Sequence, residues 1–305
     1  MKEMNILFVG GTCSGKSSLM TTMLRDWTDG LPEWIPLEAR LVKECVPASL
    51  SMNLKQLEKE EKPLNVYRSA DGYVATLQVR RKNNSLLWYW VDWLDFFRGK
   101  SSLWERDGIL LHFYERSVQT PDWHEWLAEH PTSKVPLGLV LTIDPFAEKQ
   151  EMSYSQWDRL DANVVLEELL YGMEQVYAKH PSERLSIPTA VVFTKTDIDR
   201  LYQTFGGYSS LAVQHISILH NTRDYAVESQ SRVMKRLLEG NIPHIQEILR
   251  PHRGNFVHLL NHSLEPVGYF ITTSSDKRNY YLRHKKVLRG AALPLLWLLG
   301  EIMEY

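Results

Sequence analysis

The sequence predicts an α/β protein in which a mostly parallel sheet lies between two layers of helices. Two observations predict this three-layer class. Short apolar runs typical of buried strands alternate along the chain with stripes of apolar residues at helical spacing. A glycine-rich loop separates the first apolar run from the first helical stripe. The 305 residues suffice for one large domain with insertions, and we expect a single domain over residues 1–305.

The composition is that of an ordinary globular protein, with 44% hydrophobic and 24% charged residues. The formal net charge of −2 and the pI of about 6.6 argue against a strongly basic nucleic-acid binder. The two cysteines, Cys13 and Cys45, exclude a disulfide scaffold and favour a reducing compartment. The apolar run at 291–299 contains a proline and is about half a membrane span. We therefore expect a cytoplasmic protein with no membrane span and no nucleic-acid partner.

The loop after the first expected strand, residues 5–9, carries a phosphate-binding pattern. Residues 10–17 read Gly-Gly-Thr-Cys-Ser-Gly-Lys-Ser, which matches the P-loop pattern G-x-x-x-x-G-K-[ST]. Glycines let the backbone curl so that successive N–H groups face phosphate oxygens, and the positive end of the following helix faces the same anion. The residues expected to contact nucleotide are Gly10, Thr12, Cys13, Ser14, Gly15, Lys16, Ser17 and Ser18.

Three side chains of this loop have distinct expected roles. Lys16 brings a positive charge to the β and γ phosphates and is a candidate catalytic residue, and Ser17 offers its hydroxyl to Mg²⁺. Cys13 is either a thiol of lowered pKa beside the anion or a small filler. The alternative to a nucleotide site is a glycine-rich turn that matches the pattern by chance.

A second pattern concerns the base of the nucleotide. The expected buried strand 187–193 leads directly into Thr194-Lys195-Thr196-Asp197. This stretch resembles the [NT]-K-x-D guanine motif of P-loop GTPases. The carboxylate of Asp197 can accept hydrogen bonds from guanine N1–H and the exocyclic amine together, and the stem of Lys195 can cover the base. The alternative is that Asp197 caps a helix.

The remaining periodicity predicts further elements. Residues 72–80 and 86–92 are expected to form an antiparallel hairpin, with Asn83 and Asn84 at its turn. Strands are expected at 136–143 and 266–273, and helices at 162–177, 209–250 and 293–303. The element order is therefore strand, loop, helix, hairpin and then alternating strands and helices.

This order, together with the two nucleotide motifs, resembles the Ras-like GTPases of the TRAFAC class, and is closest in look to the bacterial double-GTPase kind. The phrases at 141–145 (Leu-Thr-Ile-Asp-Pro) and 295–299 (Leu-Leu-Trp-Leu-Leu) add to the resemblance. It implies a P-loop NTPase fold that binds GTP or GDP with Mg²⁺ and acts as a switch in a multi-protein bacterial system. Ser274 or Ser275 falls where the family's last guanine-contacting loop lies, although the family triplet Ser-Ala-Lys is not reproduced.

The sequence departs from this family in both switches. The expected switch I, residues 30–72, contains no threonine to reach Mg²⁺. The expected switch II belongs with a long insert at 93–134, and its Asp-x-x-Gly motif is best matched by Asp92-Trp93-Leu94-Asp95, with an acid in place of glycine. We assign Asp92 to Mg²⁺ and both acids to catalysis; the alternative register pairs Asp95 with Gly99. Nucleotide binding is therefore better supported than hydrolysis, which is slow, partner-dependent or absent.

Several features keep alternatives open. The tryptophan-rich stretch 86–104 is either core or a surface for a protein partner, and the segment 120–134 is a surface helix, a lid or a docking arm. Arg98, Arg106 and Arg116 are either solvated or a source of an arginine finger. Two other functions compete with the GTP-dependent switch: an ATP-dependent small-molecule kinase and a P-loop scaffold that does not hydrolyse nucleotide.

Overall fold

The structure, a computed structural model, describes residues 2–12, 14–29, 37–45, 70–81, 108–120, 123–144, 162–177, 184–194, 256–271 and 290–303. Along the chain its elements are β1 (Lys2–Gly10), α1 (Lys16–Thr28), β2 (Leu37–Glu44), β3 (Tyr73–Arg81), β4 (Ile109–Ser117), α5 (Trp123–Glu129), β5 (Leu137–Ile143), α6 (Ala162–Tyr177), β6 (Thr189–Phe193), α10 (Phe256–Ser263), β7 (Val267–Ile271), a 3-10 turn (Gly290–Ala292) and α11 (Leu293–Met303).

The strands form one seven-stranded sheet in the spatial order β2-β3-β4-β1-β5-β6-β7. Strands β4, β1, β5, β6 and β7 run parallel to one another, whereas β3 is antiparallel to both β2 and β4. Because the carboxyl ends of parallel strands meet at one edge of a sheet, the segments that follow β1, β4, β5 and β6 converge there. The predicted α/β class, a mostly parallel sheet with an antiparallel pair, is confirmed.

The antiparallel pairing involves different residues from those predicted. Strand β3 agrees with the strand expected at 72–80, but its two edges pair with 37–44 and 109–117. The stretch 86–92 is therefore not its hydrogen-bonded neighbour, and it lies outside the described residues. Alternating apolar residues identify a strand, but they do not say which strand pairs with it. The prediction paired this strand with the next apolar run along the chain, whereas in the sheet it pairs with β2 and β4.

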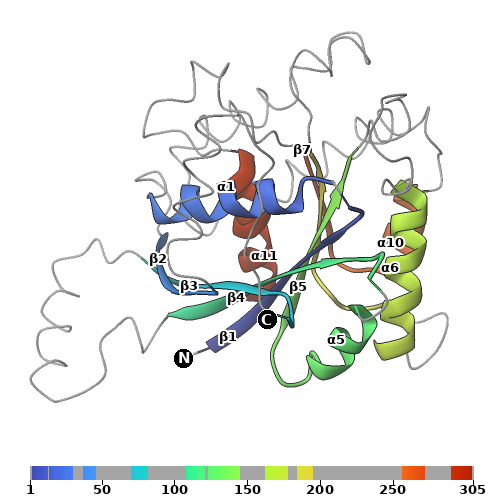
Figure 1. Ribbon diagram of the computed structural model, residues 1–305, viewed down its shortest axis with the longest axis horizontal. Coiled ribbons are helices and arrows are strands. Elements are labelled where there is room, and N and C mark those ends of the chain that lie inside the picture. The colour runs from blue at the N-terminus through green and yellow to red at the C-terminus, as the bar shows by residue number, and fades with distance from the viewer. Residues whose placement is uncertain are drawn as a thin grey trace, which may run out of the picture.

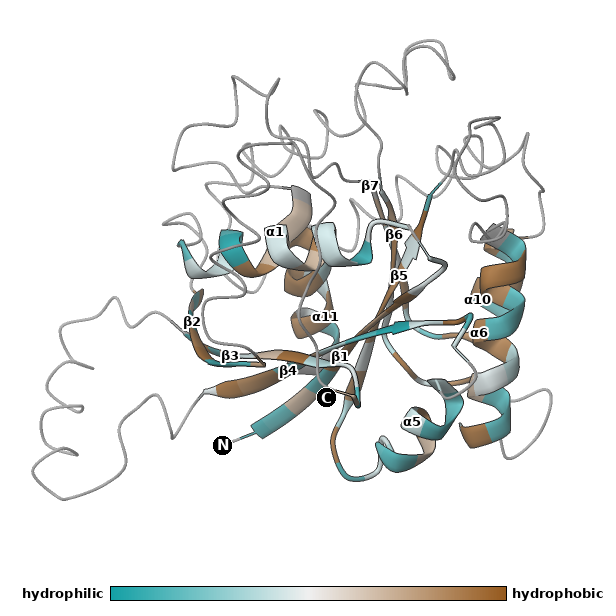
Figure 2. Ribbon diagram, in the orientation of Figure 1, coloured by the Kyte–Doolittle hydropathy of each residue, from teal (hydrophilic) through white to brown (hydrophobic). Residues whose placement is uncertain are grey.

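Helices cover both faces of the sheet (Figure 1). Helices α1 and α11 and the 3-10 turn share one apolar core with one face, and α5, α6 and α10 share a second core with the other. Strand β5, the neighbour of the central strand β1, is buried at every position, and Figure 2 shows it mainly in the apolar colour, whereas α6 carries both apolar and polar residues. The loop between β1 and α1 therefore starts from the middle of a rigid sheet.

Helix α1 is anchored along its whole length. The predicted stripe is buried: Leu19, Met20, Met23, Leu24 and Trp27. The indole N–H of Trp27 donates to the carbonyl oxygen of Ala292 in the 3-10 turn at 3.4 Å.

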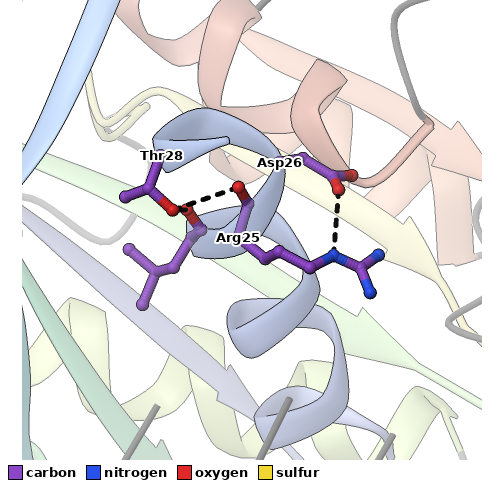
Figure 3. Close-up of polar contacts among 4 residues, drawn as sticks. Arg25, Asp26 and Thr28 are labelled. Carbon is purple, nitrogen blue, oxygen red and sulfur yellow. Dashed lines mark hydrogen bonds and ion pairs between the residues drawn. The ribbon is translucent and has the colours of Figure 1, made fainter. Parts of the chain in front are cut away.

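The last turn of α1 carries its own polar contacts (Figure 3). The Thr28 hydroxyl donates to the carbonyl oxygens of Leu24 and Arg25, at 2.9 and 3.1 Å, and Arg25 Nε lies 3.3 Å from Asp26 Oδ1. This end of the helix is opposite to the glycine-rich loop.

Two helices have the predicted bounds, 162–177 and 293–303, and β5, β6 and β7 lie within the strands expected at 136–143, 187–193 and 266–273. Two strands, one helix and the 3-10 turn of the described residues were not foreseen: β2, which lies in the expected switch I, β4, which lies in the expected switch II insert, α10, and Gly290–Ala292. The helical region expected at 209–250 lies outside the described residues.

Helix α5 belongs to the core. Its residues Trp123 and Trp126 are each 1% exposed and form part of the cluster that includes α6. The segment 123–129 is thus a packed helix and not an exposed arm. The tryptophan-rich stretch 86–104 lies outside the described residues. In the part of the chain that the structure describes, the helices are all too short or too polar to cross a membrane.

Candidate nucleotide-binding site

The glycine-rich loop joins β1 to α1, where the sequence predicts it. Gly10 ends β1, and a Cβ atom at this position would lie 2.5 Å from both the carbonyl oxygen and Oγ1 of Thr142. Gly15 precedes α1 with a φ of 88°, in the left-handed region that side chains disfavour. Each glycine is therefore required by the geometry, the first by close approach and the second by backbone conformation.

The amino-terminal end of α1 is suited to an anion. Gly15 is the N-cap and has no side chain that could satisfy the first N–H groups of the helix. The first turn carries no acidic residue, so the positive end of the helix dipole is not neutralised from within the helix. Ser18 lies in this first turn. The loop therefore leads into a helix whose start has no side-chain cap, an arrangement suited to phosphate.

Lys16 brings its charge into the loop. Its side chain is buried, and Nζ donates hydrogen bonds to the carbonyl oxygens of Gly11 at 2.6 Å and Gly10 at 3.2 Å. The ammonium group is thus positioned by the backbone of the loop itself. A buried ammonium group held in this way is placed to attract the negative charge of an anion in the loop.

A carboxylate lies against Ser17. Its hydroxyl lies 2.9 and 3.1 Å from the two carboxylate oxygens of Glu115, a buried residue of β4. Because β4 is parallel to β1 and adjacent to it, its carboxyl end brings Glu115 beside the loop. The motifs in the sequence did not predict Glu115. An acidic residue near the carboxyl end of the apolar run at 109–117 could have indicated it. Asp92 and Asp95 lie outside the described residues.

A buried network of hydroxyl groups supports the loop from below. Ser14 Oγ and Thr142 Oγ1 share a hydrogen bond of 2.7 Å, and Thr142 Oγ1 also lies 3.3 Å from the carbonyl oxygen of Val9. The Thr194 hydroxyl bonds to the carbonyl oxygen of Ser14 and lies 3.2 Å from that of Ile143. The loop is therefore tied to the ends of both β5 and β6.

Thr194 is the first residue of the expected guanine motif, and the structure places it directly against the P-loop. Lys195 and Asp197, which the sequence predicts to contact the base, lie outside the described residues, as do Cys13, Ser274 and Ser275. The contact was not predicted, because the sequence places the two motifs about 180 residues apart. It arises because β6 and β1 are separated by β5 alone.

Gln119 is a further residue of the site that the sequence did not reveal. The backbone N–H of Thr12 donates to Gln119 Oε1 at 2.9 Å, and the Thr12 hydroxyl bonds to the same oxygen. Gln119 belongs to a turn after β4, in which the N–H of Thr120 donates to the carbonyl oxygen of Ser117 at 3.0 Å. The end of β4 thus contributes both Glu115 and Gln119 to the site.

One of the three candidate arginines is described. Arg116 donates from Nη2 to the carbonyl oxygen of Ala70 at 3.2 Å, which joins β4 to the turn before β3. Arg98 and Arg106 lie outside the described residues.

The donor set fits a polyphosphate with Mg²⁺. Within the described ranges, no group of three or more His, Cys, Asp or Glu side chains could hold a metal by itself. Mg²⁺ does not need one, because it commonly binds through one or two oxygen side chains together with substrate phosphates. Ser17 and Glu115 present hard oxygen atoms of this kind beside the loop.

No protein-family model matches the chain, and no curated protein matches it in sequence. Solved structures that the chain matches include the following two. Sup35 complexed with GMPPNP is 11% identical, with a TM-score of 0.27, over 90% of this chain and 37% of that chain. The signal recognition particle receptor SRβ-GTP/SRX complex from Chaetomium thermophilum is 14% identical, with a TM-score of 0.35, over 90% of this chain and 92% of that chain. The sequence identities and TM-scores are too low for either structure to assign a function to this chain.

Proposed function

We propose that this chain is a P-loop protein that binds GTP and GDP with Mg²⁺. One observation carries the proposal: the buried ammonium group of Lys16 lies inside a loop that Gly10 and Gly15 shape, at the uncapped start of α1. Backbone N–H groups, a helix terminus and a positioned cation together form a phosphate site. A loop that matches the pattern by chance does not account for the burial of Lys16.

Ser17 and Glu115 are the residues that we propose for Mg²⁺. The bound ion would offset the negative charge of the phosphates. Ser17 offers its hydroxyl, and Glu115 orients that hydroxyl and contributes the negative charge of its carboxylate. Asp92 remains a proposed ligand from the sequence, and Asp92, Asp95 and Lys16 remain the proposed catalytic residues.

Guanine specificity is proposed from residues 194–197. The hydroxyl of Thr194 fixes the start of this stretch to the backbone of the P-loop. The phosphates and the base belong to one nucleotide, so a segment that reads the base must begin close to the phosphate loop. Residues 194–197 begin there. Asp197 would accept from guanine, Lys195 would cover the ring, and Ser274 or Ser275 would complete the base site.

At the level of the whole protein, we propose a GTP-dependent switch in a multi-protein bacterial system. Hydrolysis would be slow or partner-dependent, since the sequence lacks the usual switch residues. The proposed partner surface is the tryptophan-rich stretch 86–104, and the proposed location is the cytoplasm. The alternatives of an ATP-dependent kinase and a non-hydrolysing scaffold make different predictions in the experiment that follows.

The test is a calorimetric titration of GTP, GDP and ATP, each with Mg²⁺, into wild type and Asp197→Asn. We expect guanine nucleotides to bind at least tenfold more tightly than ATP to wild type. Asp197→Asn should remove this preference, because the amide cannot accept both guanine donors. The matched control is Asp29→Asn, at the exposed carboxyl end of α1 and away from the loop.

Each other outcome selects an alternative. Tighter binding of ATP would exclude the guanine assignment and support a kinase. If Asp197→Asn leaves the nucleotide preference unchanged, the guanine assignment is also wrong, and the kinase and scaffold alternatives take its place. If no nucleotide binds to the folded wild-type protein, the P-loop proposal is wrong.

A further inference from the structure

The contact between Gln119 and Thr12 involves a donor that a phosphate also needs. Gln119 Oε1 accepts from both the backbone N–H of Thr12, at 2.9 Å, and its hydroxyl. Thr12 lies in the middle of the P-loop, where backbone N–H groups face phosphate oxygens. An N–H group has one hydrogen, so a phosphate oxygen and Gln119 compete for it. This inference therefore rests on the proposed nucleotide site.

The backbone around Gln119 holds its side chain in reach of the loop. Its own N–H donates to Ser117 Oγ at 3.3 Å, and Ser117 Oγ lies 3.4 Å from Gln119 Oε1. The N–H of Val118 donates to the carbonyl oxygen of Gly10 at 3.3 Å. The backbone of this exposed glutamine is thus held by the turn after β4, which places its side chain within reach of Thr12.

The same turn is hydrogen-bonded to the first residue of α5. The Thr120 hydroxyl donates to the carbonyl oxygen of Ser117 at 2.6 Å, and the N–H of Trp123 donates to the carbonyl oxygen of Thr120 at 3.3 Å. Trp123 is buried against Gly172 of α6. A change at Gln119 is therefore connected, through one turn, to a helix of the second core.

We propose that Gln119 is a built-in competitor of the nucleotide at the P-loop. Its side-chain carbonyl holds the amide of Thr12, and a nucleotide phosphate displaces it. The displacement removes one of the contacts that tie the turn 117–120 to the loop, while the bond from the Val118 N–H to Gly10 remains. The nucleotide then binds more weakly than it would to a loop without Gln119. The apparent dissociation constant is the intrinsic one divided by the fraction of molecules in which the Thr12 amide is not bonded to Gln119. Nucleotide binding is reported to α5 by the same displacement.

The experiment compares dissociation constants for Mg²⁺-GTP and Mg²⁺-ATP in wild type, Gln119→Ala and Gln119→Asn. Asparagine keeps the amide but is one methylene shorter, so it tests reach with little change in chemistry. Both variants should bind nucleotide roughly three- to tenfold more tightly, as expected when one net hydrogen bond no longer competes. A purely structural glutamine predicts weaker or unchanged binding, so the direction of the change is diagnostic.

Two further variants sharpen the comparison. Thr12→Ala keeps the N–H but removes the hydroxyl donor, and it should tighten binding by a smaller factor. Glu125→Ala, an exposed change on α5, should leave the dissociation constants unchanged. Hydrogen exchange at the amides of Thr120 and Trp123 should accelerate on nucleotide addition in wild type and much less in Gln119→Ala.

The outcomes separate this proposal from the function on which it rests. If wild type binds nucleotide but Gln119→Ala and Gln119→Asn bind no more tightly, competition by Gln119 is excluded and the nucleotide site stands. If the folded wild type binds neither nucleotide, both proposals are wrong. If ATP is the better ligand, the guanine assignment is wrong, and the tighter binding of the two variants to ATP still supports the competitor.

Discussion

The space around Gly10 is too small for a side chain. A Cβ atom there would lie 2.5 Å from a backbone oxygen of β5 and 2.9 Å from Ser14 Oγ. The backbone oxygen belongs to a central strand and cannot move away without disturbing the sheet. The size of this residue therefore determines whether the loop can lie over β5 at all.

We expect Gly10→Ala to lower the free energy of unfolding by about 1–3 kcal/mol, because the added methyl overpacks a rigid site. It should also abolish nucleotide binding. Urea denaturation followed by circular dichroism measures the first effect, and calorimetry the second. The matched control is Gly300→Ala in α11, where an added Cβ meets no atom within 4 Å. That change should stabilise the protein by about 0.5–1 kcal/mol through helix propensity. A Gly10→Ala protein as stable as wild type would contradict the packing argument.

Among the elements, α5 and α6 are joined through the partly buried phenol of Tyr177. Tyr177 lies at the end of α6, and its hydroxyl lies 3.2 Å from the carbonyl oxygen of Leu127 and 3.3 Å from that of His130. Burial raises the pKa of Tyr177 from 10 to about 12, since a phenolate is poorly solvated there. The neutral phenol is therefore part of the contact between the two helices.

This shift predicts a pH dependence of stability. The folded-state pKa is raised above the unfolded value, so the stabilisation is fully present below pH 10 and is lost as the pH rises towards 12. Tyr177→Phe removes this ionisation, so the stability difference between wild type and the variant should shrink over that range. Urea denaturation from pH 8 to 11.5 measures it. Tyr171→Phe, on the exposed side of α6, is the control. A difference that stays constant with pH would contradict the assignment.

Over the whole molecule, nucleotide and Mg²⁺ should stabilise the fold by mass action. At a concentration of 100 times its dissociation constant, Mg²⁺-GTP should raise the free energy of unfolding by about 2.7 kcal/mol. Removal of Mg²⁺ with EDTA should reduce this gain, because the phosphates lose their counter-charge. In Glu115→Gln the gain with Mg²⁺ should fall towards the EDTA value, since the amide still accepts from Ser17 but carries no charge.

Thermal and urea unfolding with and without EDTA provide the measurement. The control is Glu38→Gln, which removes a partly exposed carboxylate on β2 that pairs with Arg80, away from the loop. An equal dependence on Mg²⁺ in Glu115→Gln and wild type would exclude Glu115 from the metal site and return attention to Asp92.

Local patterns in the sequence determined much of this protein. The periodicity at 162–177 and 293–303 predicted both helices to the residue, because one apolar stripe is a local property. The loop at 10–17 was readable for the same reason, since its glycines and Lys16 are required within eight consecutive residues. The α/β class with a mostly parallel sheet followed from the alternation of such segments.

The tertiary structure alone decided which of these segments lie side by side. Strand pairing depends on the edges that are available in the whole sheet, so 73–81 pairs with 37–44 and 109–117 and not with 86–92. That pairing places β4 beside β1 and thereby brings Glu115 to Ser17 and Gln119 to Thr12. The sequence alone determined the glycine-rich loop at 10–17. Only the order of the strands decided that Glu115 and Gln119 contact this loop, because contacts between distant strands leave no local pattern in the chain.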